Sequence, residues 1–255
     1  MRATVGIRAG AWLVIGGCIV GACAAPSMVR IAAGPFRMGC DLDRRCGTTE
    51  GASPGHDVTL SAFEIDRTEV TRAAYAGCVA AGACAAPGCD GAPEQPVSCV
   101  SWRDAREFCT WRHARLPTEA EWERAARGPG EGRPFPWGNA APSCARANYL
   151  GCTGGPRPVG QTPAGSTPDG IADLAGNVSE WVADWFSGDA YRASASDPQG
   201  PATGELRGVR GGAYDDPAGD ADNPLHVAAR DAAPPDRRLP TRGFRCARSV
   251  GVKTP

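Results

Sequence analysis

Cysteine content is the feature that most constrains how this chain can fold. The chain has 255 residues and twelve cysteines, two of which, Cys18 and Cys23, lie in an N-terminal segment of secretory character. An even number of cysteines in an exported chain indicates a framework of disulfides. The ten that remain after this segment are Cys40, Cys46, Cys78, Cys84, Cys89, Cys99, Cys109, Cys144, Cys152 and Cys246.

Short spacings suggest which of these cysteines are joined. We predict local bridges at Cys40–Cys46, Cys78–Cys84 and Cys144–Cys152, whereas the pattern alone leaves the other pairings open. The chain contains no pair of C-x-x-C motifs. A zinc ribbon is therefore a poor alternative to disulfides.

The pattern of residues 1–23 is typical of an export signal. Two arginines give a basic start, residues 11–20 form an apolar run, and small residues precede Cys23. The run is too short to span a bilayer as a stable helix. Residues 20–23 (VGAC) also resemble a lipobox, in which Cys23 is lipidated and anchors the protein to a membrane; ordinary cleavage near Ala24 is the alternative. We expect a protein of the periplasm or cell envelope.

The composition indicates one loop-rich folded domain. The chain has 34 glycines, 23 prolines and a net charge of −1. The high glycine and proline content predicts many loops. The net charge near zero gives no support for nucleic-acid binding. No repeat or linker is evident, so we predict a single domain at 30–249 and a short tail at 250–255.

Capping residues and alternating patterns predict the regular elements. Helices are expected at 72–80, from 102 to a break at 116–117, and at 119–127, after the N-cap residues Thr71, Ser101 and Thr118. Strands are expected at 31–38, 58–65, 206–212, 226–230 and 243–248. Residues 173–185 (DLAGNVSEWVADW) are the most polar-aromatic stretch, and three interpretations stay open: an exposed strand, a loop that holds a hard cation, or an acidic face beside an aromatic platform.

A series of short motifs follows in one order along the chain. They are VTL at 58–60, EVT at 69–71, VSW at 100–102, RLPTEAEWE at 115–123, PWGN at 136–139, ANY at 147–149, GNV at 176–178, EW at 180–181, RGG at 210–212, AAR at 228–230 and GFRCA at 243–247. Together they resemble the sulfatase-modifying factor family, whose type member is the formylglycine-generating enzyme. The resemblance covers residues 30–249 and implies a single compact, loop-rich α+β domain related to C-type lectin-like folds.

The resemblance also implies two structural sites. A family disulfide would join Cys109 to Cys246. A calcium cage would be formed by the side chains of Asp173 and Glu180 and the carbonyl oxygens of Gly176 and Val178, which are the oxygen ligands that calcium prefers.

Copper chemistry is the activity that the resemblance brings into question. The type enzyme oxidises a substrate cysteine with O2 and binds Cu(I) through two cysteines between the RGG and AAR motifs. Here that segment, 210–230, contains no cysteine, and the two positions fall near Asp216 and Asp222. Carboxylates are hard ligands and do not replace a dithiolate Cu(I) site.

We therefore expect no copper cofactor and a binding or divergent member of the family. The alternative is an active oxidase whose thiolate ligands come from another part of the chain. The cysteines between residues 78 and 99 are the ones available for this.

The rest of this segment suggests a groove. Its candidate residues are Arg210, Tyr214, His226 and Arg230, and the ligand would be a peptide, a protein or a glycan. The nearby Arg207, Arg242 and Arg245 either line the same anionic groove or pair with the acidic loop at 215–222, and we favour the pairing. The loop itself either holds a divalent cation or, as we prefer, is solvated.

Overall fold

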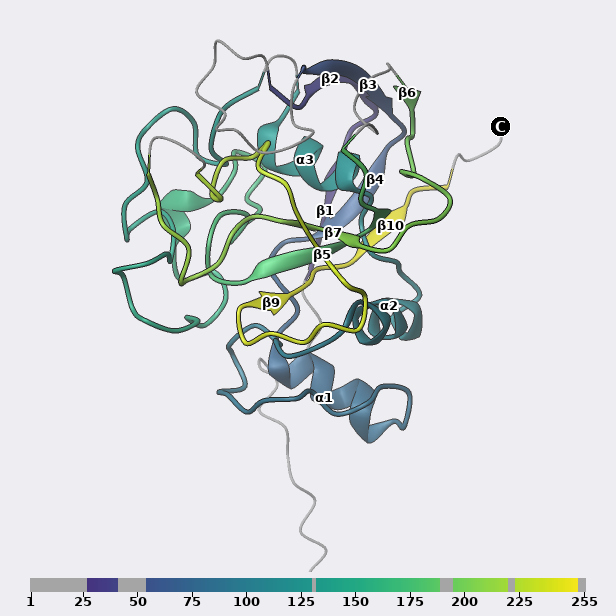
Figure 1. Ribbon diagram of the computed structural model, residues 1–255, viewed down its shortest axis with the longest axis vertical. Coiled ribbons are helices and arrows are strands. Elements are labelled where there is room, and N and C mark those ends of the chain that lie inside the picture. The colour runs from purple at the N-terminus through teal and green to yellow at the C-terminus, as the bar shows by residue number, and fades with distance from the viewer. Residues whose placement is uncertain (1–26, 41–53, 130–131, 189–194, 220–222, 252–255) are drawn as a thin grey trace, which may run out of the picture.

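Three helices and three small sheets form the framework of the described chain (Figure 1). The structure is a computed structural model that describes residues 27–40, 54–129, 132–188, 195–219 and 223–251. The signal segment with Cys23, the bridge partner Cys46, Asp222 and most of the tail lie outside these residues. No helix within the described ranges is long and apolar enough to cross a membrane.

Each of the first two sheets joins two strands from the N-terminal part of the chain to one later strand. One joins β1 (Met28–Ile31), β4 (Phe63–Asp66) and β10 (Ala247–Ser249), and the other joins β2 (Gly34–Met38), β3 (His56–Leu60) and β6 (Ala195–Ser196). The single strand predicted at 31–38 is wrong, because β1 and β2 belong to different sheets. The prediction of one strand at 58–65 is also wrong, because β3 and β4 belong to different sheets. The backbone N–H and hydroxyl of Ser61 both donate to the Asp197 carboxylate at 2.7 Å, which holds the chain in a corner between them.

The third sheet crosses the middle of the molecule. Its order is β8 (Asp231–Ala233), β7 (Arg207–Arg210), β5 (Ser179–Trp185) and β9 (Arg242–Gly243). The strand predicted at 226–230 is wrong, because these residues form turns and β8 begins only after them. The His226 side chain decides this, since its Nδ1 accepts the Ala228 N–H at 3.1 Å and so stabilises a turn.

The helices α1 (Arg72–Ala80) and α3 (Glu119–Arg127) have the predicted bounds, whereas α2 (Trp102–Trp111) ends before the predicted break. The three predicted N-caps accept backbone N–H groups, and α2 and α3 carry complete capping boxes. After α2, His113 takes a left-handed backbone with φ of 55°, so the chain turns before it reaches residue 116.

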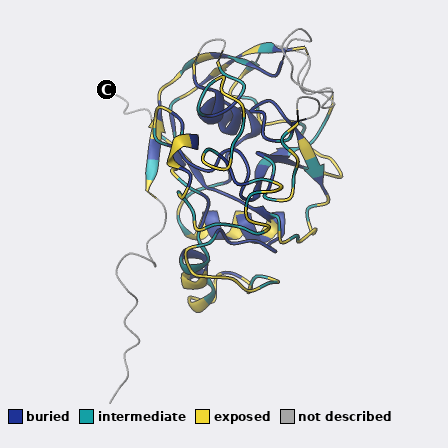
Figure 2. Ribbon diagram, turned by 90° about the vertical axis from the view of Figure 1, so that its left-hand side faces the viewer, coloured by how far each residue is buried: buried dark blue, intermediate teal, exposed yellow. Residues whose placement is uncertain are grey.

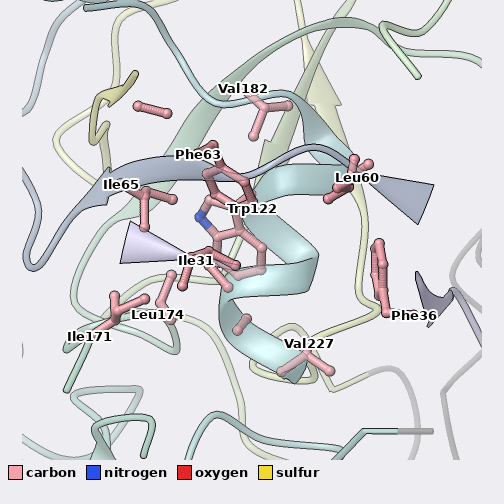
Figure 3. Close-up of a cluster of buried hydrophobic side chains, with 14 of the residues drawn as sticks. Ile31, Phe36, Leu60, Phe63, Ile65, Trp122, Ile171, Leu174, Val182 and Val227 are labelled. Atoms are coloured by element: carbon pink, nitrogen blue, oxygen red, sulfur yellow. The ribbon is translucent and has the colours of Figure 1, made fainter. Parts of the chain in front are cut away.

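Helix α3 is at the centre of the main core. It contacts β2, β3, β5 and β7, and Figure 3 shows Trp122 surrounded by side chains from several strands, among them Ile31 and Phe63. Every residue of α3 is buried, including its glutamates and arginines (Figure 2). Such a helix is stable only if its charged side chains find partners inside the protein. The partners lie on β7 and just before β8, and they shape the site described below.

A second core joins the two lower helices to the C-terminal segment. Tyr75 of α1 stacks on Phe108 of α2 at 5.4 Å, and Phe244 meets the edge of both rings. The disulfide Cys109–Cys246 lies in this core with both cysteines fully buried, and it is the pairing that the resemblance implied. Tertiary packing and a covalent bond therefore fix the C-terminal segment against α2.

Local disulfides hold the loops that carry little regular structure. The structure contains the predicted bridges Cys78–Cys84 and Cys144–Cys152, and also Cys89–Cys99, which spacing alone left open. No described cysteine is free. Several disulfides in one chain are typical of a protein that folds in an oxidising compartment.

Candidate functional site

A pocket of about 450 Å³ opens beside β7, where the resemblance places the copper ligands. The end of β7 and its glycine bend form one wall, and the segments around β8 and β9 form the other. Its charged lining residues are Arg210, Asp215, Asp216, Arg230, Asp231 and Arg242. The residues that line it include neither cysteine nor histidine. The pocket is therefore a polar cavity of mixed charge.

Asp216, near which the resemblance places the first family cysteine, is half-buried in the pocket wall. One carboxylate oxygen accepts the Ala213 N–H at 2.8 Å, so the side chain closes the turn that follows β7. Burial raises the pKa of Asp216, and the neighbouring Asp215 raises it further. A carboxylate with these contacts is a hard oxygen donor, unlike the thiolates that select Cu(I).

Arg210 and Arg230 line the pocket, but their guanidinium groups are held by helix α3. Arg210 Nη2 lies 2.6 Å from Glu123 and its Nη1 lies 3.2 Å from Glu119. Arg230 binds both oxygens of Glu119, at 2.7 and 2.8 Å, and stacks over Phe186. These two arginines are the partners that the buried glutamates of α3 require. They also form a rigid floor for the pocket.

For Arg207 and Arg245 the favoured prediction, pairing with the acidic loop, is wrong within the described part of that loop. Arg207 instead lies between the rings of Trp102 and Trp185, 3.6 and 3.5 Å from their centroids. Arg245 binds Glu180 on the other side of the sheet. On β7, Arg207 and Arg210 lie three positions apart, so their side chains face opposite sides of the sheet.

Arg242 lines the pocket, and its guanidinium is only partly paired. Its Nη2 lies 3.1 Å from Asp231, and the group stacks 4.8 Å from the Trp181 ring. Its Nη1 is buried and has no hydrogen-bond partner among the described residues. Sequence reasoning missed Asp231, and its position directly after the AAR motif was the available signal.

Two predicted groove residues, Tyr214 and His226, are not among the pocket-lining residues. His226 is buried, and burial lowers its pKa to about 4, so the imidazole is neutral near pH 7. It stabilises the turn before β8 and meets the edge of Phe135. Half-buried Tyr214 is fixed through its backbone N–H, which donates to the Asn177 carbonyl at 3.0 Å. The structure thus brings two of the four predicted residues into the pocket.

The predicted calcium residues lie where the chain enters β5. Asp173 accepts the Gly160 N–H at 2.6 Å and the Thr162 hydroxyl at 3.2 Å. Glu180 binds Arg245 through both oxygens at 2.7 Å, and one of these oxygens also accepts Trp122 Nε1 at 2.9 Å. Only glycine fits at Gly176, because a Cβ there would lie 2.2 Å from the Asn148 carbonyl oxygen.

Three buried carboxyl groups lie near one another at this place. Glu69, which the sequence did not single out as a site residue, is fully buried and accepts the Asn177 amide and the Val178 N–H. Burial raises the pKa of Glu69 well above its usual value, and the charges of Asp173 and Glu180 raise it further. Three buried carboxylates thus face one guanidinium, that of Arg245.

Hydrogen bonds use part of the acceptor capacity of the two carboxylates at this place. A carboxylate has about four acceptor positions, and the hydrogen bonds above leave one on Glu180 and two on Asp173. Within the described residues, no three His, Cys, Asp or Glu side chains form a group that could hold a metal. A cation here would therefore rely on the carbonyl oxygens of Gly176 and Val178 as well.

Comparison with known proteins agrees with this fold. The family described as "Sulfatase-modifying factor enzyme 1-like domain" matches residues 20–250. The chain is 34% identical to a formylglycine-generating enzyme of Streptomyces coelicolor over 88% of this chain and 90% of that protein. It is 37% identical to "Inactive C-alpha-formylglycine-generating enzyme 2" of Mus musculus over 62% of this chain and 50% of that protein.

A solved structure supports the same assignment. PvdO from Pseudomonas aeruginosa has a TM-score of 0.75 and 30% sequence identity, and the match covers 88% of this chain and 95% of that one. The motif order, the single loop-rich α+β domain and these matches agree. The chain belongs to the sulfatase-modifying factor family.

Proposed function

We propose that this protein is an exported, disulfide-stabilised binding member of its family that does not carry out copper-dependent formylglycine formation. One observation carries the proposal: segment 210–230, which forms much of the pocket wall, contains no cysteine. The pocket remains, with charged groups of both signs, but its sulfur ligands do not.

The disulfides support this interpretation. A redirected oxidase would need two thiolates near the pocket, and the available region was Cys78–Cys99. Its four cysteines form the bridges Cys78–Cys84 and Cys89–Cys99, so they supply no thiolate in the oxidised protein. Soft thiolate ligands are what select Cu(I) over other ions.

An active formylglycine-generating oxidase is the second candidate, and the extent of similarity favours it. The Streptomyces coelicolor relative carries that name and matches nearly its whole length. An inactive relative from Mus musculus matches at a similar identity, so identity alone does not separate the two candidates.

A turnover assay separates them directly. The purified oxidised protein is loaded with Cu(I) and incubated with O2 and a sulfatase-derived cysteine peptide, and the aldehyde product is measured by mass spectrometry. The Streptomyces coelicolor relative, treated identically, is the positive control. We expect no product above the protein-free reaction, whereas copper-dependent product would overturn the proposal.

Binding by the pocket is the positive half of the proposal. The ligand is a peptide, a protein segment or a glycan that enters the cavity beside β7. Arg242 and Asp231 are the polar groups offered to it, because Arg210 and Arg230 are held by α3. A secretory signal at 1–23, with Cys23 as the lipid-bearing residue, would place this pocket in the periplasm or at a membrane surface.

Calcium is proposed as a structural ion in this protein. Asp173 and Glu180 would hold it through side-chain oxygens, and Gly176 and Val178 through backbone carbonyls. When bound, the ion adds positive charge beside the buried carboxyl groups of Asp173, Glu180 and Glu69. Its expected role is to fix the loop before β5, which is short of regular structure.

A further inference from the structure

The bridge Cys89–Cys99 differs from the other described disulfides in what contacts its sulfur. Arg72 Nη2 lies 3.4 Å from Cys89 Sγ, and Ser98 Oγ lies 3.6 Å from the same atom. Arg72 also donates from Nη1 to the Cys89 carbonyl at 2.5 Å and from Nη2 to Ser98 at 3.0 Å. The guanidinium is therefore fixed against one sulfur of the bridge.

A positive charge at this position has a specific chemical effect. A nearby arginine stabilises a cysteine thiolate and lowers its pKa. A neutral disulfide gains little from the same contact, so the guanidinium favours the reduced form of the bridge. A disulfide whose reduced form is stabilised has a more oxidising potential and is reduced more easily.

The bridge is also more accessible than the buried Cys109–Cys246. Cys89 is half-buried, and it lies in a loop where Gly88 and Asp90 are exposed. Cys99 is buried and has a left-handed backbone with φ of 56°, which is uncommon for a residue other than glycine. Its N–H donates to the Leu239 carbonyl at 2.9 Å, in the segment that leads to the pocket residues Thr241 and Arg242.

We propose that Cys89–Cys99 is a thiol–disulfide exchange site, which a dithiol reductant reduces before the other described bridges. The reductant's two thiols supply two electrons and become a disulfide. The Cys89–Cys99 bond breaks, Cys89 leaves as a thiolate beside Arg72, Cys99 takes one proton and the second proton goes to solvent. The partner is a dithiol oxidoreductase of the compartment to which the protein is exported.

Redox titration tests this proposal with a matched internal control. The native protein is equilibrated with graded ratios of reduced to oxidised dithiothreitol and quenched in acid. Free thiols are then alkylated, and each bridge is measured by mass spectrometry. Cys144–Cys152 closes a loop of similar size, and within the described residues neither of its sulfurs contacts an arginine. We expect half-reduction of Cys89–Cys99 at a reductant ratio at least tenfold lower than for Cys144–Cys152.

Two arginine variants separate charge at the sulfur from charge nearby. Arg72→Gln should make Cys89–Cys99 about tenfold harder to reduce, which corresponds to about 30 mV. Arg157→Gln is the matched control, because Arg157 Nη1 donates to the Cys144 carbonyl at 2.8 Å; it should shift neither bridge. Equal midpoints for the two bridges, or equal shifts in the two variants, would overturn the proposal.

A second measurement does not depend on reduction of the bridge. Cys99→Ser leaves Cys89 as a single thiol, whose pKa is read from thiolate absorbance in the ultraviolet. We expect a pKa below the ordinary value of about 8.5, and we expect Arg72→Gln in the same background to raise it. Arg72→Lys, which keeps the charge, should restore part of the effect. An ordinary or raised pKa for Cys89 beside an intact Arg72 would refute the inference.

Discussion

Removal of the long-range disulfide Cys109–Cys246 should cost the protein more than removal of any local bridge. Its cysteines are separated by 137 positions, whereas those of Cys144–Cys152 are separated by 8. In the chain-entropy model a bridge stabilises the fold by restricting the unfolded chain, and the effect grows with the logarithm of the loop length. These separations give about 5 kcal/mol for the long loop and about 2.5 kcal/mol for the short one.

The assay compares two double variants, Cys109→Ala with Cys246→Ala, and Cys144→Ala with Cys152→Ala. Neither variant leaves an unpaired thiol. Urea unfolding in non-reducing buffer gives the free energy of unfolding and the m-value. We expect the first variant to be less stable than the second by roughly 2–3 kcal/mol. It should also have a larger m-value, because an uncrosslinked unfolded chain exposes more surface.

The two bridges also differ in packing, and this difference affects the free energy of unfolding. Cys109 and Cys246 are fully buried beside Phe108 and Phe244, so loss of sulfur contacts adds to the destabilisation but does not change the m-value. Equal free-energy losses for the two variants, or an unchanged m-value when the long bridge is removed, would refute the entropic reasoning.

Three further results are expected. Chelation of calcium should lower the melting midpoint of the wild-type protein by several degrees, and an unchanged midpoint would argue against a cation at 173–180. Arg210→Met should cost about 2–3 kcal/mol in urea unfolding, because it removes charge-assisted hydrogen bonds from the buried Glu119 and Glu123, whereas Arg103→Met, in an exposed pair, should cost no more than about 1 kcal/mol. Burial and the charge of Glu119 raise the pKa of Asp184 to about 7. The folded state therefore binds this proton more tightly than the unfolded state, and stability falls as the pH rises from about 4 to about 7. Asp184→Asn should remove this fall when unfolding is compared at pH 5 and pH 8, and an unaltered pH dependence would contradict it.

The helices were predictable because their signals are local. Thr71 and Thr118 accept N–H groups three residues ahead, and these contacts need no other part of the chain. The bridge Cys78–Cys84 follows from the same logic, since a separation of 6 keeps the two sulfurs close in most conformations. The family motifs, read together, also determined the α+β fold class.

Strand boundaries were harder to predict, because they depend on distant partners. Val58 and Leu60 alternate in one phase and Phe63 and Ile65 in the other, and all four are buried in the main core. The two strands pair with different partners, and Asp197, 136 residues further along, holds the corner at Ser61 between them. At 226–230, the apolar residues face the core from turns rather than from a strand.

The candidate site divides in the same way. The sequence by itself determined that segment 210–230 has no thiolate, because ligand identity is a property of the residues present. Only the tertiary structure decided what the arginines do. Arg210 and Arg230 bind the glutamates of a helix about ninety to one hundred and ten positions earlier, because a buried charge takes whichever opposite charge the fold brings within reach. The fold also places Arg72 against Cys89 Sγ, and no spacing in the sequence encodes this contact.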